Sequence, residues 1–111
     1  MVMSPEDFEE QVRAAFYDVP PDLARALENV AIVVEDENPE EPDIFGWYDG
    51  LGPTGERAGA LPDRVVIYRL PLVDSFSDPE ELRREIRITV LHEVGHFFGL
   101  DEERIRELGY G

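Results

Sequence analysis

The sequence contains no cysteine, and this absence excludes disulfide bonds and thiolate metal sites. It also leaves no sign of an oxidising compartment. The opening segment "MVMSPEDFEEQV" lacks the basic start and the apolar stretch of a secretory signal. No apolar run approaches the roughly 20 residues that a membrane-spanning helix needs. We therefore expect a soluble, cytoplasmic protein with no membrane partner.

Positive charge is also scarce. Lys and Arg together number 10 against 26 Asp and Glu, which gives a formal net charge of −16 at pH 7. Such a surface repels phosphate backbones, so we do not expect a nucleic-acid partner. The acidic surface keeps the protein soluble, and it also favours a basic peptide, a cationic partner or a metal ion.

The length and composition set the size of the fold. At 111 residues, of which 42% are hydrophobic, the chain is globular in composition and has room for one modest core. We therefore expect a single domain over residues 1–111.

The first half of the chain predicts two helices followed by strands. Ser4-Pro5 has the cap and first-turn proline of a helix start, and this helix should end before Pro20-Pro21. A short helix from Pro21 to about Glu28 follows. The β-branched run Val30–Asp36 predicts a buried strand, and a short strand is expected near Ile44–Tyr48, before a glycine-rich loop that reaches Asp63.

The second half predicts one more strand and the longest helix. The strand spans Arg64–Leu70 and should end at Pro71. Ser77 or Asp78 then caps a helix that runs to about Phe98, and Gly99 is placed to end it. A last short helix starts at Asp101 and ends near Gly109. The resulting order α-α-β-β-β-α-α indicates an α+β fold, with a small mixed sheet packed by helices.

Histidine is rare, and both histidines of the chain lie in the stretch "TVLHEVGHFFGLDEE" on the long helix. Residues four apart share one helix face, so the imidazoles of His92 and His96 can bind the same tetrahedral zinc ion. Glu93 is turned roughly 100° away, which suits a carboxylate that takes a proton from a water held near the ion. "HEVGH" therefore fits the H-E-x-x-H pattern, with a role for each letter.

Plainer interpretations of these residues remain open. The histidines could be ordinary polar residues near the negative end of a helix, and Glu93 a solvated helix residue. Gly95 would let another segment approach the helix closely. Trp47 and Tyr48 could line a cleft or offer a phenol to a developing oxyanion, although an aromatic pair usually covers the core.

The stretch "HEVGHFFGLDE" resembles the extended zincin pattern H-E-x-x-H-x-x-G-x-x-H/D. From about Asp43 onward the chain resembles the small bacterial zincin-like metallopeptidases, which share an "LPDR…IYR" strand ahead of this helix. The resemblance implies a minimal zincin-like domain with one Zn²⁺ per chain. It makes His92 and His96 ligands, Glu93 the general base and Glu102 the third ligand.

The third ligand is the open point of this resemblance. Glu102 stands where metzincins usually have histidine, and no methionine follows to form their Met-turn. Asp101 is the rival ligand. Both acids also have a simple structural interpretation, because Asp101 can cap the last helix and Glu102 can be its first residue.

The function that follows is hydrolysis of peptide bonds by metal-activated water. An edge strand, either Arg64–Leu70 or Ile44–Tyr48, would pair with an extended peptide or protein substrate, and the acidic surface favours a basic one. The alternative is a zincin-like module that binds metal or peptide without cleaving. Histidine and carboxylate ligands also suit divalent transition ions other than zinc, and the oligomeric state cannot be derived from the sequence.

Overall fold

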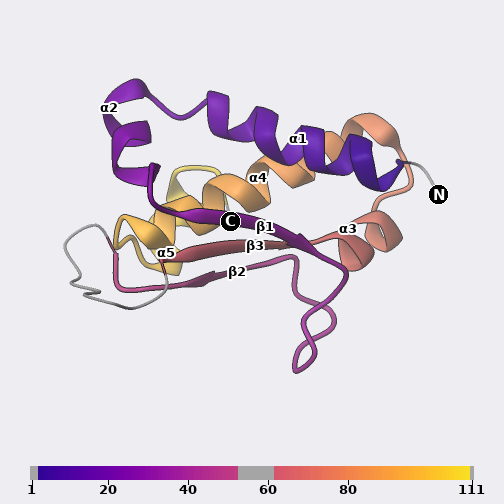
Figure 1. Ribbon diagram of the computed structural model, residues 1–111. Helices are drawn as coiled ribbons and strands as arrows, with labels where there is room; N and C mark the ends of the chain where they lie inside the picture. Colours follow the sequence, from indigo (N-terminus) through magenta and orange to yellow (C-terminus); the bar gives the residue numbers. More distant parts are fainter. Residues whose placement is uncertain (1–2, 53–61, 111) are drawn as a thin grey trace.

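A three-stranded mixed sheet and the helices packed on it form the frame of the protein (Figure 1). The computed structural model describes residues 3–52 and 62–110. The strands are β1 (Ala31–Glu35), β2 (Gly46–Asp49) and β3 (Arg64–Tyr68). The expected strand near 44–48 is therefore present with a shift of one to two residues, and residues 53–61 of the predicted loop lie outside the described part of the chain.

β3 is the central strand of this sheet. It pairs in parallel with β1 and antiparallel with β2, in the order β1-β3-β2. Four of its five side chains are buried, as the continuous apolar run predicts for a strand with neighbours on both sides. The expectation that β3 could be a peptide-binding edge is wrong, because both of its edges are already paired.

Two helical segments precede the sheet. α1 (Pro5–Tyr17) begins where the Ser4 hydroxyl accepts the Asp7 N–H at 3.1 Å, as the sequence predicts. The second predicted helix is divided between α2 (Pro21–Ala24) and the 3₁₀ turn η1 (Arg25–Leu27). α1 packs along α4 (Pro79–Phe97), so the first and the longest helix form one layer.

A helix that the sequence analysis did not expect follows β3. α3 (Arg69–Ser75) begins directly after the strand and includes Pro71 in its first turn. The strand thus ends at Tyr68, and the prediction that it continues to Leu70 is wrong. The first four N–H groups of a helix need no partner within the helix, so a proline there fits without loss of a hydrogen bond.

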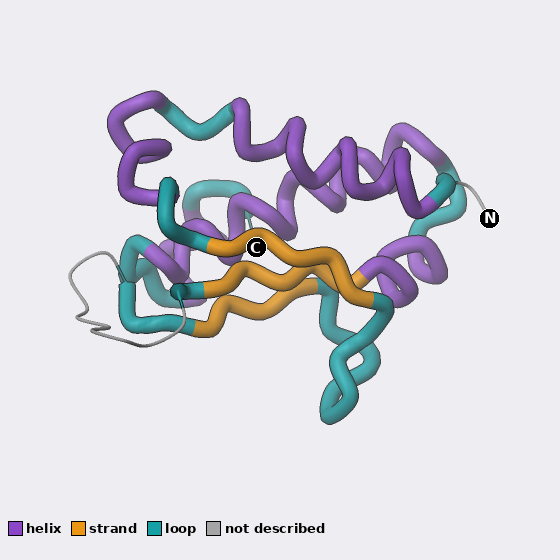
Figure 2. The backbone as a smooth tube through the Cα atoms, viewed as in Figure 1, coloured by secondary structure: helices purple, strands orange, loops and turns teal. Residues whose placement is uncertain are grey.

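The long helix α4 matches its prediction closely. The Asp78 carboxylate accepts the Glu81 N–H at 3.2 Å, so Asp78 is the cap, and Phe98 follows the last helical residue. The final helix is α5 (Glu102–Glu107), whose cap is Asp101. Figure 2 shows the helices gathered to one side of the strands, while the loop after β1 extends away from them.

The core lies between α1, α4 and the sheet. α4 contacts β2 and β3 as well as α1, so other elements cover it on several sides. Its buried apolar side chains recur at spacings of three or four residues: Leu82, Ile86, Val90, Val94 and Phe97. From α1 come Phe8, Val12 and Ala15, and from β3 come Val65 and Ile67.

In the described part of the chain, none of the helices combines the length and the apolar character that a membrane span requires.

Candidate metal centre

The last two turns of α4 carry both histidines toward the same point in space. The rings of His92 and His96 have centroids 4.9 Å apart and are inclined by 76°. Their spacing of four residues places them one turn apart on one face. On the opposite face of the same turns, Val90, Val94 and Phe97 pack into the core. This packing fixes the rotation of the helix and therefore the side on which both rings lie.

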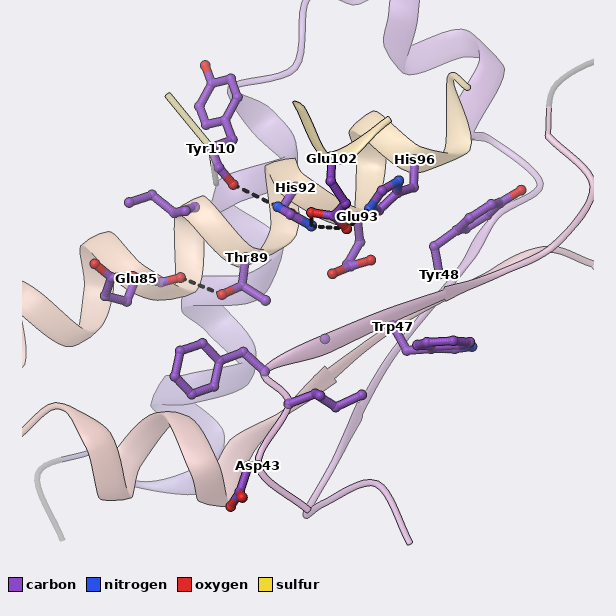
Figure 3. Close-up of a pocket in the computed structure, with 14 residues that line it drawn as sticks. Asp43, Trp47, Tyr48, Glu85, Thr89, His92, Glu93, His96, Glu102 and Tyr110 are labelled. Carbon is purple, nitrogen blue, oxygen red and sulfur yellow. Dashed lines mark hydrogen bonds and ion pairs between the residues drawn. The ribbon is translucent and has the colours of Figure 1, made fainter. Parts of the chain in front are cut away.

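The Glu102 carboxylate closes this site from the start of α5. Its Oε1 lies 2.7 Å from His96 Nε2 and 3.2 Å from His92 Nε2. Figure 3 shows the carboxylate between the two rings. The structure thus brings together both predicted histidines and the predicted third acid. Asp101 caps α5 instead, because its Oδ1 accepts the Arg104 N–H at 2.8 Å.

Backbone carbonyls fix the tautomer of both rings. His92 Nδ1 donates to the Tyr110 carbonyl at 2.8 Å, and His96 Nδ1 donates to the Leu100 carbonyl at 3.0 Å. A carbonyl oxygen only accepts, so each Nδ1 must carry the hydrogen. In a neutral ring the Nε2 atom is then left with its lone pair, and both lone pairs face Glu102.

This arrangement fits a bound cation. Two Nε2 lone pairs and an ionised carboxylate are all acceptors, and acceptors within about 3 Å of one another need a proton or a positive ion between them. Two imidazoles and one carboxylate are a donor set that zinc and related divalent ions take. Outer hydrogen bonds from the free ring nitrogens to carbonyl groups are the usual support of histidine ligands.

Glu93 lies at the buried side of the same site, with 7% of its surface exposed. One ligand atom from each of His92, Glu93 and His96 can be chosen so that the three lie within 4.8 Å of one another. Burial raises the pKa of Glu93, and the nearby charges of His92 and His96 oppose this shift in part. The carboxyl is thus held close to the histidines in a partly dry environment.

The pKa values of the two acids of the site shift in opposite directions. Burial also raises the pKa of Glu102, but its hydrogen bonds and charge interactions with His96 and His92 outweigh burial, so the pKa lies below the ordinary value. Glu102 therefore stays ionised over a wider pH range than an isolated glutamate, as a metal ligand must.

Gly46 on β2 makes room for Glu93. A Cβ at this position would lie 2.9 Å from Thr89 Cγ2 and 3.1 Å from Glu93 Cγ, so any side chain would displace them. Thr89 itself is buried, and its hydroxyl donates to the Glu85 carbonyl at 2.8 Å within the helix. The sequence analysis did not single out Gly46, although a glycine inside a strand is a known signal of close backbone approach.

A cleft of about 720 Å³ opens in front of these residues. β2 and the segment before it line one side, from Asp43 to Tyr48, and α4 lines the other, from Glu85 to His96. Tyr110 also reaches this cleft, although no sequence pattern predicted that the end of the chain lies there. The edge of the sheet that faces the candidate metal centre is therefore β2.

The aromatic pair on β2 has two different environments. Trp47 is 50% exposed and lies at the rim of the cleft. The Tyr48 hydroxyl donates to Asp63 Oδ2 at 2.6 Å and accepts the Gly52 N–H at 2.7 Å. Because its single proton is directed to Asp63, the phenol of Tyr48 is not available as a donor to an oxyanion in this arrangement.

Comparison with known proteins identifies the class. A family model described as zincin-like metallopeptidase matches residues 27–111, and the chain belongs to this family. The match begins earlier than the resemblance suggested, since it includes β1 as well as the segment from Asp43. The minimal zincin-like α+β fold that the sequence analysis expected is thereby confirmed.

A solved structure supports the same fold. It is that of a conserved hypothetical protein from Thermus thermophilus, with 24% sequence identity and a TM-score of 0.58. The alignment covers 84% of this chain and 92% of that one. At this identity the likeness establishes the fold alone. No curated protein matches the chain.

Proposed function

We propose that the protein is a zinc-dependent peptidase in which His92, His96 and Glu102 hold one zinc ion per chain and Glu93 is the general base. The observation that carries this proposal is the convergence of two imidazoles, each with its Nδ1–H committed to a carbonyl, on one ionised carboxylate. Membership of the zincin-like family supports it independently.

The ligands are assigned by contact. Glu102 lies within hydrogen-bonding distance of both Nε2 atoms, whereas Glu93 is buried beneath them against β2. An ion bound there would polarise the scissile carbonyl and acidify a nearby water, which is the chemistry that zinc supplies in such sites. The protein contributes the fixed ring tautomers and the ionised third carboxylate.

Glu93 has the properties of a proton carrier in this reaction. Its buried carboxylate has a raised pKa, so it binds a proton more readily than an exposed glutamate. It would accept the proton of the attacking water and then release it to the leaving amine. Its position next to both histidines and beside the cleft supports this role.

The substrate would be a peptide or a protein segment laid along β2. The Tyr68 N–H donates to the Phe45 carbonyl at 2.8 Å. In an antiparallel pair, residues that hydrogen-bond across the strands alternate with residues that do not. Phe45 bonds to Tyr68, so the N–H and C=O groups of the next residue, Gly46, point away from β3 toward the outer edge, beside Glu93. An extended peptide added there would pass the metal site, and the charge of −16 favours a basic one.

Replacement of the proposed base is the direct test. We expect Glu93→Gln to retain one zinc per chain, because no ligand is removed, and to lower the rate of peptide hydrolysis by about 100-fold or more. The measurements are elemental analysis and cleavage of a labelled basic peptide. Glu103→Gln is the matched control, because it removes the same charge from an exposed position on α5 and should leave both readouts unchanged.

The result also separates the proposal from its alternative, a zincin-like module that binds metal or peptide without cleaving. Zinc binding by the wild-type protein without hydrolysis of any peptide would favour that module. A Glu93→Gln variant that cleaves at the wild-type rate would rule out Glu93 as the base.

A further inference from the structure

α4 and α5 end in the same way, and after each end a backbone carbonyl accepts a hydrogen bond from a histidine. At the end of α4, Gly99 has φ of 85° and donates its N–H to the His96 carbonyl at 3.0 Å. The Leu100 N–H then donates to the Gly95 carbonyl at 3.0 Å. These are the paired hydrogen bonds of a Schellman motif, which requires a left-handed residue and therefore favours glycine.

The end of α5 repeats this geometry ten positions later. Gly109 has φ of 94° and donates to the Arg106 carbonyl at 3.0 Å. The Tyr110 N–H donates to the Ile105 carbonyl at 3.1 Å. The residue after the glycine is thus fixed by its N–H in both motifs, and its own carbonyl is left to point outward from the helix end.

Each of these carbonyls meets one histidine. The Leu100 carbonyl accepts from His96 Nδ1 at 3.0 Å, and the Tyr110 carbonyl accepts from His92 Nδ1 at 2.8 Å. Figure 3 shows that the backbone of Tyr110, and not its phenol, faces the ring of His92. The second contact joins residues 18 positions apart, so local helix geometry does not explain it.

We propose that Gly99 and Gly109 are positioning residues, whose left-handed turns aim the next carbonyl at His96 and His92 and so hold each ring in the Nδ1–H tautomer. This inference rests on the proposed function, because its consequence is that both Nε2 atoms are ready to bind a metal. In a neutral imidazole either nitrogen can carry the hydrogen, and the acceptor that one nitrogen finds decides which.

One contact separates this role from plain helix termination: the Tyr110 carbonyl reaches His92 on α4 at 2.8 Å. In the described part of the chain, apart from adjoining residues, no heavy atom lies within 4 Å of a Cβ built at Gly99 or Gly109, so a side chain there would cause strain in φ rather than a collision. A glycine that only ended α5 would not need the following carbonyl to reach α4. The effect of substitution should therefore appear in the histidine ring and not only in the stability of the helix.

Gly109 offers the cleaner experiment, because α5 and Glu102 precede it in the chain and need not move. The variant is Gly109→Val, in which a β-branched side chain strongly disfavours positive φ. Gly109→Asn is the conservative companion, since asparagine tolerates this conformation. Leu108→Ala, at an exposed position of the same helix end, controls for loss of apolar contact.

The readout is the ¹⁵N spectrum of the imidazole rings in the metal-free protein, recorded in alkaline buffer so that neutral rings are compared. With two histidines in the chain, the spectrum contains two ring systems. In Gly109→Val we expect His92 to lose its uniform Nδ1–H signature while His96 keeps its own. Gly109→Asn and Leu108→Ala should resemble the wild type.

Zinc affinity is the second readout. We expect it to fall about 10-fold or more in Gly109→Val, as for loss of other outer partners of a ligand, and to be recovered in Gly109→Asn. If Gly109→Val does not fold, Gly109→Ala provides the same comparison with less strain.

The proposal is overturned if His92 keeps the Nδ1–H tautomer in a folded Gly109→Val or Gly109→Ala protein. It is equally overturned if the spectra of both histidines change together. Because the spectra are recorded without metal, this outcome is independent of the proposed function, whose own failure would appear as a wild-type protein that binds no zinc.

Discussion

Asp101 and Glu102 are neighbours in the chain, yet their carboxylates meet different groups. Asp101 accepts a backbone N–H and caps α5, while Glu102 contacts both histidines as the first residue of the same helix. The two interpretations of Glu102 in the sequence are an acid at a helix start and an acid at a metal site. In the structure, one position is both the first residue of α5 and part of the candidate metal centre.

Paired alanine variants should separate these two acids. We expect Asp101→Ala to lower the free energy of unfolding by about 1 kcal/mol through loss of the cap, with a smaller effect on zinc affinity. Glu102→Ala should lower zinc affinity by about 100-fold or more with little loss of metal-free stability, because its carboxylate is exposed. Thermal unfolding and zinc titration measure the two quantities. If Asp101→Ala weakens zinc binding more than Glu102→Ala does, the ligand assignment is wrong.

Glu93 links the site to the pH dependence of stability. Burial raises its pKa in the folded protein, so the folded state holds this proton to higher pH than the unfolded state does. The stability that Glu93 contributes is therefore complete below the unfolded-state pKa and is lost as the pH rises through the folded-state pKa. Glutamine cannot ionise and does not lose it.

We accordingly expect metal-free Glu93→Gln to gain stability over the wild type as the pH is raised from below about 4 to about 8. Melting curves of both proteins at several pH values test this, with Glu103→Gln as the control for the change in net charge. A stability difference that stays constant or shrinks with rising pH would contradict the assigned direction.

At the scale of elements, the contact between α4 and α5 determines where Glu102 lies. Gly95 faces Ile105, which is 1% exposed, and a Cβ on Gly95 would lie 3.0 Å from the Ile105 side chain. The predicted role of Gly95, to let another segment approach the helix, is thus confirmed, and the segment is α5. The turn at Gly99 brings α5 back to this surface.

Gly95→Val should push α5 away from α4. We expect zinc affinity to fall by about 10-fold, because Glu102 and the Tyr110 carbonyl move with α5, and stability to fall by about 1–3 kcal/mol from overpacking. Adding Ile105→Ala should remove the clash and recover part of the affinity, as measured by calorimetric titration. Unchanged zinc affinity in the folded single variant would show that the position of α5 does not control the site.

The elements that the sequence predicts best are those with local signals. α1, α4 and α5 each have a side-chain cap, and α1 and α4 also have apolar residues at helical spacing. α3 was missed because Pro71 was interpreted as the end of a strand, whereas a proline is also acceptable in a first helical turn. The position of β3 at the centre of the sheet depends on pairing between distant segments, which no local pattern determines.

At the scale of the whole molecule, the candidate site is assembled from three separated segments. α4 supplies the histidines and Glu93, β2 supplies Gly46, and the end of the chain supplies Glu102 and the Tyr110 carbonyl. His92, Glu93, His96 and Glu102 were predicted because they form one short motif. Gly46 and Tyr110 act through the backbone, and residue type alone does not reveal such contacts.

The charge of −16 is also a property of the whole molecule. We propose that it attracts a metal ion and a basic peptide toward the cleft over a long range, an effect that salt would weaken. That residues 1–111 form a single domain remains a prediction from length and composition.

The central claim is that His92, His96 and Glu102 bind one divalent ion. The most direct measurement is a crystal structure of the protein grown with zinc, in which anomalous scattering locates the metal. We predict one ion per chain, with both Nε2 atoms at about 2.0–2.1 Å and a Glu102 oxygen at about 2.0–2.2 Å. Zinc bound by other residues, or no zinc between these two rings, would contradict the account.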